Sequence, residues 1–146
     1  MRVTVQEAAF DLGAESARFA REANGAGAIV TFTGLVRDTA GALTGMEIEH
    51  YPGMSERAIA AMIDEAGARW SLIDALVIHR FGRLAVGEAI MMVATASPHR
   101  SAAFAAAEFL MDYLKSRAPF WKKEISATGA EWVAATEADE TTLKRW

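Results

Sequence analysis

The feature that most constrains the fold is an apolar run at residues 89–96 that leads directly into a long helical pattern. The run reads AIMMVATA and contains no charged residue, which is typical of a strand buried on both faces. Immediately after it, Ser97 can cap a helix, and Pro98 suits the first helical position because an N–H there has no partner within the helix. The stretch therefore predicts a central, buried strand that is followed at once by the main helix.

The main helix has a clear apolar face and a clear end. Small and apolar residues recur in it at helical spacing, namely Ala103, Ala106, Ala107, Leu110, Tyr113 and Leu114. Ala118 precedes Pro119 and is therefore biased away from the helical backbone conformation. We expect the helix to end near Arg117.

The rest of the chain alternates between helix-like and strand-like patterns. Further helices are expected from residue 11 or 13 to about residue 23, and from Ser55 to about residue 70. Residues 131–135 form either a last strand or a short helix, and the other strands are expected at residues 2–5, 28–37, 46–51, 76–80 and 121–126. The remaining stretches predict a loop at 38–45 and a polar tail at 137–146.

About three helices among six or so strands indicate a single α+β domain, with a mixed or antiparallel sheet, that covers residues 1–146. A chain of 146 residues, of which 52% are hydrophobic, is long enough to bury one real core. No internal repeat or interdomain linker interrupts the pattern.

Charge and hydropathy exclude several classes of protein. The net charge is −4 and the pI is near 5.4, which argues against a general nucleic-acid binder. Any anion site is therefore a local concentration of cations on an acidic background. The chain has no run of about eighteen apolar residues and no signal-peptide pattern, so we expect a cytoplasmic protein with no membrane partner.

The chain contains no cysteine, which excludes disulfides, thiolate metal sites and a catalytic thiol of its own. Its three histidines, His50, His79 and His99, are scattered without the spacing of metal ligands. We therefore expect no metal site, and we expect His50 and His79 to be structural.

Two groups of basic residues flank the main helix. His99 and Arg100 lie at its expected start, where free backbone N–H groups and the helix dipole favour an anion. Lys115, Lys122 and Lys123 lie near or beyond its end. If the two adjacent lysines lie in a strand they point to opposite faces, so at most one of them enters a pocket.

Each of these residues also has a simpler explanation. Lys115 stabilises the last turn of a helix, His99 can pair with a neighbouring carboxylate, and Arg37, which ends a strand and opens a loop, can simply be solvated. A lysine beside other cations, however, can have a lowered pKa and then serve as a base or a nucleophile. The residues alone therefore predict an anion-binding site with one or two working lysines and leave its chemistry open.

Five segments carry a resemblance to a known family. They are FTGLVRD at 32–38, EHYPGM at 49–54, SPHRSAAF at 97–104, DYLKSRAPFWKKE at 112–124 and the terminal KRW. In this order, and over nearly the whole chain, they resemble the large, catalytic subunit of molybdopterin synthase. The resemblance implies an α/β hammerhead fold, a homodimer of the large subunit and a heterotetramer with a small subunit.

The resemblance also implies a reaction. Members of this family convert cyclic pyranopterin monophosphate to molybdopterin by installing a dithiolene. The sulfur arrives as a thiocarboxylate on the C-terminal Gly-Gly of a small ubiquitin-like partner, whose tail enters a pocket of the large subunit. The absence of cysteine in this chain agrees with sulfur supplied from outside, and no other cofactor is implied.

The resemblance also implies which residues form the site, because each site residue of the family can be matched to a position in this chain. The two important lysines of the family fall on Lys115 and Lys122, which are the candidate catalytic residues. The substrate-binding arginine falls on Arg37, and the anion-binding His-Arg pair falls on His99 and Arg100.

Other positions concern the rim of the pocket. Lys123, from the same cluster of cations, is a further candidate for substrate binding. The chain departs from the family pattern at Leu35, where some relatives carry Lys, and at Thr136, where some carry Arg. The loop after Arg37 is also short.

The spacing of the candidate residues predicts a shared site. His99 and Lys115 are sixteen residues apart on one expected helix, which separates their backbones by roughly 24 Å at about 1.5 Å per residue. Side chains cannot bring both residues onto one phosphorylated pterin from such a distance. We therefore expect two copies of the chain to share the site, with the His99 end of one copy near the Lys115 end of the other.

Two other functions are open at this point. One is a non-catalytic scaffold subunit that binds a phosphate or pterin without turnover. The other is an unrelated enzyme that forms a Schiff base on a lysine. Retention of both Lys115 and Lys122 favours sulfur transfer over the scaffold.

Overall fold

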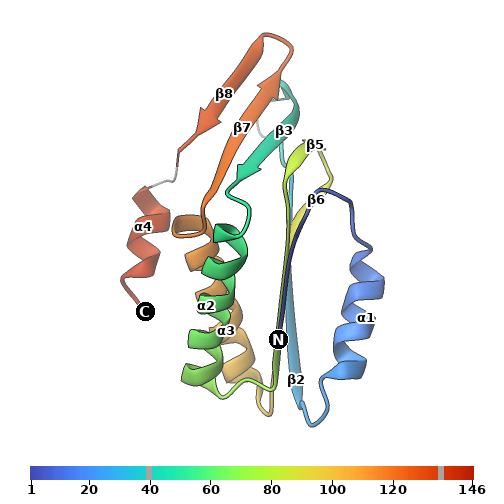
Figure 1. Cartoon of the computed structure of the whole chain (residues 1–146), viewed down its shortest axis with the longest axis vertical. Coiled ribbons are helices and arrows are strands. Elements are labelled where there is room, and N and C mark those ends of the chain that lie inside the picture. The colour runs from blue at the N-terminus through green and yellow to red at the C-terminus, as the bar shows by residue number, and fades with distance from the viewer. Residues whose placement is uncertain (39–40, 135–136) are drawn as a thin grey trace.

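The computed structural model describes residues 1–38, 41–134 and 137–146. Within them, the chain forms two four-stranded sheets and four helices. Figure 1 shows the first sheet between flanking helices, with the second sheet extending from its upper end. None of the described helices is long and apolar enough to cross a membrane. The expected α+β class is confirmed.

The first sheet holds the buried strands. Its order is β1-β4-β6-β2, in which β1 pairs parallel with β4 and the other pairs are antiparallel. Its members are β1 Arg2–Gln6, β2 Ala28–Leu35, β4 Asp74–Arg80 and β6 Ala89–Ser97. The apolar run that predicts a central strand is β6, and it is buried from Ile90 onward.

Helices cover both faces of this sheet, as Figure 1 shows. They are α1 Leu12–Glu22 on one face, and α2 Met54–Trp70 with α3 Arg100–Ser116 on the other. On β4, Leu76 belongs to the apolar cluster under α1, whereas the next residue, Val77, belongs to the cluster under α2 and α3. Successive residues of a strand point to opposite faces, so a sheet covered on both faces requires continuously apolar strands.

The second sheet is antiparallel, with the order β5-β3-β7-β8. Its members are β3 Leu43–His50, β5 Gly82–Ala85, β7 Phe120–Ser126 and β8 Gly129–Val133. For the segment that begins at residue 131, the sequence left open a last strand or a short helix. The structure shows the strand β8 there. β3 begins three residues earlier than expected. β5 was not expected as a strand, because four residues with only Leu84 buried are too short to show a pattern.

The main helix begins later than expected. The N-cap of α3 is His99, whose side chain makes no capping hydrogen bond, and Ser97 belongs to β6. The prediction that Ser97 caps the helix and that Pro98 opens it is therefore wrong. The reason is strand pairing: the carbonyl of Ser97 accepts a hydrogen bond from Gly27 N at 3.0 Å, and its hydroxyl donates to the carbonyl of His99. A Cβ on Gly27 would lie 2.2 Å from the carbonyl oxygen of Pro98, so only glycine fits there.

The segment expected to be a polar tail contains a helix. Residues 137–143 form α4 (Glu137–Leu143), which raises the helix count from the expected three or so to four. Glu137, Asp139 and Glu140 stand in its first turn, where the helix dipole favours negative charge. Arg117, which closes α3 at the expected place, donates to Glu140 at 2.8 Å and so ties α4 to α3.

Trp146 anchors the chain beyond α4 to the core. Its ring stands almost perpendicular to Trp70 and Phe109, with centroid distances of 5.5 and 5.6 Å. Its Nε1 donates to Asp112 at 2.6 Å, and Arg69 donates to its carbonyl oxygen at 3.1 Å. The C-terminal segment is therefore held by both α2 and α3.

Replacing Trp146 by Ala is expected to lower the free energy of unfolding by about 1–3 kcal/mol, because a partly buried ring and its hydrogen bond are lost. Urea denaturation measures the change. The matched control is Trp132→Ala, which removes a ring that is 56% exposed and should change the free energy by less than about 1 kcal/mol. Equal effects of the two substitutions would contradict the anchoring role.

Candidate functional site

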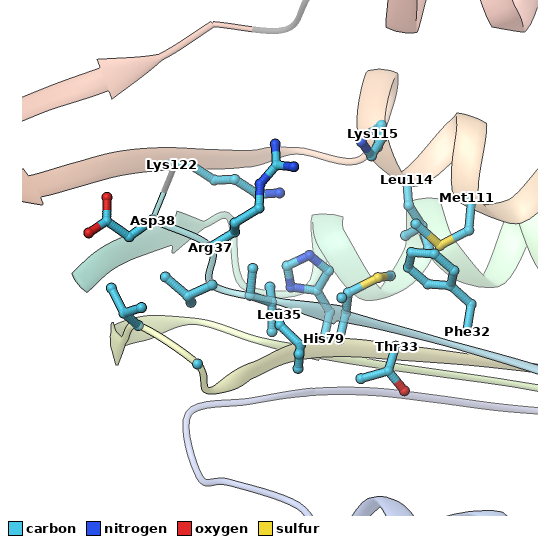
Figure 2. Close-up of a pocket in the computed structure, with 16 residues that line it drawn as sticks. Phe32, Thr33, Leu35, Arg37, Asp38, His79, Met111, Leu114, Lys115 and Lys122 are labelled. Atoms are coloured by element: carbon cyan, nitrogen blue, oxygen red, sulfur yellow. The ribbon is translucent and has the colours of Figure 1, made fainter. Parts of the chain in front are cut away.

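A pocket of about 680 Å³ lies between the end of β2, the last turn of α3 and β7 (Figure 2). Three cations line it, namely Arg37, Lys115 and Lys122. The other lining residues are mainly apolar and include Phe32, Leu35, Ile90, Met91, Met111 and Leu114. The pocket therefore combines an apolar surface with a cationic wall.

Separate elements deliver the three cations. Arg37 follows the end of β2, Lys115 lies in the last turn of α3, and Lys122 lies on β7. The chain turns at Pro119 between α3 and β7, so Lys122 folds back beside the end of the helix. The structure thus brings the two candidate catalytic lysines together with Arg37.

Lys122 has an unusual electrostatic environment. Partial burial lowers the pKa of its ammonium, the positive charge of Lys115 lowers that pKa further, and Asp139 opposes both effects. Lys115 is more open, with a side chain that is 56% exposed and an Nζ that lies 3.9 Å from Asp139 Oδ1. A lysine with a lowered pKa loses its proton more readily, so Lys122 is suited to act as a base or a nucleophile.

Lys123 lies away from the pocket, as the alternation along a strand predicts. Its Nζ stands 4.3 Å from the ring centroid of Trp132 on β8, a cation–π contact on the opposite face of the second sheet. The structure therefore does not bring this candidate substrate-binding residue to the other cations of the chain.

His99 and Arg100 line a second pocket, of about 450 Å³, together with Gly27, Ala28, Pro98 and Ser101. This pocket is at the N-terminal end of α3, whereas Lys115 is at the C-terminal end. At about 1.5 Å per residue the helix separates the two ends by roughly 24 Å. Within one chain, the His-Arg pair and the lysines therefore do not form a single site.

The first pocket also contains His79, which the sequence indicates only as a structural residue. His79 lies on β4, is 3% exposed, and stacks on Phe120 with a centroid distance of 3.8 Å and an interplanar angle of 13°. Its Nδ1 is 2.8 Å from the carbonyl oxygen of Arg80, so Nδ1 carries the hydrogen and Nε2 is an acceptor. Nothing in a sequence distinguishes such a histidine from an ordinary core residue.

The charge state of His79 follows from its burial. Burial lowers the pKa of its ring to about 3; the hydrogen bond to Arg80 opposes this shift, and Lys122 and His50 add to it. His79 is therefore neutral at neutral pH. A group with so low a pKa is a weak base, so its contribution to the pocket is that of a hydrogen-bond acceptor.

Two expectations about the pocket rim have different outcomes. Leu35 lines the pocket and is 54% exposed, so this departure from the family pattern does lie at the rim. Thr136 lies outside the described residues. Among the residues that are described, no group of three or more His, Cys, Asp or Glu side chains could hold a metal ion.

The buried neutral His79 predicts a pH-dependent stability. An unfolded chain protonates this histidine below about pH 6.5, whereas the folded chain does so only near pH 3, so the unfolded state binds more protons in between. The free energy of unfolding should therefore fall as the pH is lowered through this window. We predict a shallower fall for His79→Phe, by up to about 1.4 kcal/mol per pH unit, in urea denaturation at several pH values. Equal slopes for the two proteins would contradict the assignment.

Comparison with known proteins shows which family this chain resembles. Residues 5–117 match the family model described as MoaE protein. The chain is 73% identical over 146 residues to a molybdopterin synthase catalytic subunit from Cereibacter sphaeroides, with full coverage of both chains.

Solved structures resemble the whole domain. A molybdopterin biosynthesis MoaE protein from Burkholderia ambifaria superposes with a TM-score of 0.83 at 47% identity, covering 99% of this chain and 96% of that one. Molybdopterin synthase from Staphylococcus aureus superposes with a TM-score of 0.82 at 32% identity, covering 90% and 96%. The family predicted from the sequence motifs is confirmed, and this chain belongs to the MoaE family of molybdopterin synthase catalytic subunits.

Proposed function

We propose that this chain transfers sulfur from the C-terminal thiocarboxylate of a small ubiquitin-like subunit to cyclic pyranopterin monophosphate, forming the dithiolene of molybdopterin. The observation that carries the proposal is the pocket in which Arg37, Lys115 and Lys122 converge beside an apolar surface. The cations suit a phosphorylated substrate and a thiocarboxylate, both of which are anionic, and the apolar surface suits a flat pterin ring. The family to which the chain belongs supports the same reaction.

The two lysines take different parts in this reaction. In each transfer a carbon–sulfur bond forms on the pterin as a carbon–oxygen bond to the same carbon breaks. Water then cleaves the bond between sulfur and the carbonyl carbon of the partner, so the sulfur stays on the pterin and the partner leaves as a carboxylate. Lys122, whose pKa is lowered by burial, is the group better suited to accept and return a proton. Lys115 offers its more exposed ammonium to negative charge that develops during transfer.

The sulfur comes with the partner, because this chain has no cysteine to carry it. No cofactor bound to this chain is required. A tail that ends in Gly-Gly suits a narrow pocket, because extended glycine has no side chain to obstruct its passage. The tail is proposed to end beside Lys115 and Lys122.

A second copy of the chain is proposed to complete the site. β2 is an edge strand of the first sheet, and its Ile29 and Phe32 are 39% and 41% exposed. Phe104 of α3, the helix that packs on β2, is 61% exposed. An unpaired strand edge with exposed apolar side chains is suited to a two-fold contact.

Antiparallel pairing of two β2 strands would join the two halves of the site. His99 and Arg100 lie beside the Ala28 end of β2, whereas Arg37 follows the Leu35 end. A two-fold axis through the middle of β2 places the first end of one copy beside the second end of the other. His99 and Arg100 of one copy would then bind the substrate phosphate together with Arg37 of the other.

Replacing Lys115 or Lys122 by Ala is expected to lower the rate of dithiolene formation by at least about 100-fold, because general acid–base help is worth roughly 10²–10⁴-fold. The measurement uses the purified chain with a thiocarboxylated partner and the pterin precursor. Lys144→Ala, which removes an exposed lysine that does not line the pocket, is the matched control and should keep the wild-type rate.

The same assay separates the alternative functions. A loss below about threefold for both pocket variants would remove the two lysines from the mechanism. A scaffold subunit would give no product even with the wild-type chain. A Schiff-base enzyme would be trapped by borohydride with a carbonyl substrate in the absence of any partner protein.

Complementation tests the shared site. An inactive His99→Ala/Arg100→Ala chain is mixed with an inactive Lys115→Ala chain. Mixed dimers then hold one intact site, so partial activity is expected. If mixed dimers are shown to form and no activity is recovered, the proposal of a site shared between two copies is contradicted.

A further inference from the structure

Two groups that line the pocket complement each other chemically. Lys122 presents an ammonium with three hydrogens to donate, and His79 presents the lone pair of Nε2. Among residues 1–38, 41–134 and 137–146, neither atom has a hydrogen-bond partner in the structure. A partly buried donor and an acceptor on a buried residue thus stand in one pocket.

The backbone fixes which nitrogen of His79 is the acceptor. Nδ1 lies 2.8 Å from the carbonyl oxygen of Arg80, and a carbonyl oxygen can only accept. Arg80 is itself buried, and its guanidinium donates twice to the carbonyl of Glu7, at 3.0 and 3.1 Å. Because Arg80 is held in this way, its carbonyl holds His79 in the tautomer with an unprotonated Nε2.

Packing fixes the direction of the ring. Phe120 stacks on His79 at 3.8 Å, and Phe120 is two residues before Lys122 on the same face of β7. In Figure 2 the ring of His79 lies on the side of the pocket below Lys122 and Arg37, with a ring nitrogen facing them. The acceptor is therefore rigid, whereas the donor is carried by a flexible four-carbon stem.

We propose that His79 is a positioning residue for Lys122: its Nε2 accepts a hydrogen bond from the Lys122 ammonium, directly or through one water, and fixes the place of that ammonium in the pocket. The proposal rests on the proposed function only where it concerns sulfur transfer. His79 itself touches no reacting atom in this scheme.

Other charges that act on Lys122 come from several elements. Lys115 on α3 contributes positive charge and Asp139 on α4 contributes negative charge. Arg37 and Asp38, which follow β2, are charged residues that line the same pocket. His50, on β3, is a further titratable group that acts on His79. His79 differs from the lysines, Arg37 and the two aspartates because it stays neutral at neutral pH, so it can orient the ammonium without changing the charge of the pocket.

The pKa of Lys122 tests the proposal without substrate or partner. The chain has four lysines, so carbon-labelled lysine gives a resolvable NMR titration in which Lys122→Arg assigns the signal. His79→Phe keeps a ring on Phe120 but removes the acceptor, so the pKa of Lys122 should fall, because the protonated amine loses its partner. His79→Gln returns an acceptor near the position of Nε2 and should restore the pKa towards the wild-type value.

A matched control separates this effect from altered packing. Met91 lines the same pocket and is 6% exposed, so Met91→Leu disturbs the packing without removing an acceptor. It should leave the pKa of Lys122 unchanged. An unchanged Lys122 pKa in His79→Phe, or an equal fall in Met91→Leu, would overturn the proposal.

A second measurement keeps His79 intact and so does not depend on the folding of His79→Phe. Nitrogen NMR of the wild-type chain should show hydrogen on Nδ1 and none on Nε2 at neutral pH. Lys122→Met removes the donor and should shift the Nε2 resonance. The proposal would be overturned by a hydrogen on Nε2, by a charged ring, or by an Nε2 resonance that has the same chemical shift in Lys122→Met as in the wild-type chain.

The synthase assay then shows the effect on turnover. His79→Phe should lower kcat by about 10-fold with the KM for the pterin precursor unchanged, and His79→Gln should recover most of the loss. A raised KM with unchanged kcat would overturn the positioning role. An inactive wild-type chain would instead count against the proposed function alone, because the NMR titrations need no turnover.

Discussion

The pairing of β6 with β4 on one side and β2 on the other is the constraint on which the rest of the structure depends. Because β6 is buried on both faces, α1 must cover one face of the sheet while α2 and α3 cover the other. The pairing continues to Ser97, which delays the start of α3 to Arg100. His99 and Arg100 then stand beside the first residue of β2, and the pocket forms where β2 ends. Strand pairing therefore sets the distance between the His-Arg pair and the cations of the pocket.

A pocket with three cations carries internal repulsion, and the structure limits it. The effect is visible in the pKa of Lys122, which Lys115 lowers in addition to burial. Asp139 on α4 acts in the opposite direction, and the exposure of Lys115 allows solvent to screen its charge. An anion in this pocket would raise the pKa of Lys122, because opposite charge favours the protonated form. Occupancy of the pocket and protonation of Lys122 are therefore coupled.

Features set by local chemistry could be predicted from the sequence. The apolar run predicts β6, Pro119 ends α3, and alternation along a strand separates Lys122 from Lys123. Features set by distant contacts could not. α4 has no apolar period of its own, and the segment after it is held by the contact of Trp146 with α2 and α3. His79 likewise belongs to the site only through Phe120 and Lys122, which follow it far along the chain.

A neutral acceptor beside Lys122 has consequences that a charged one would not. A carboxylate at that position would raise the pKa of Lys122 and would also repel a phosphate or a thiocarboxylate. A protonated histidine would add a fourth positive charge and lower the pKa of Lys122 further. His79 does neither, because burial lowers its pKa to about 3 and the carbonyl of Arg80 directs its one hydrogen away from Nε2. The pocket thus keeps its positive potential for anionic substrates while one of its lysines is given a defined place.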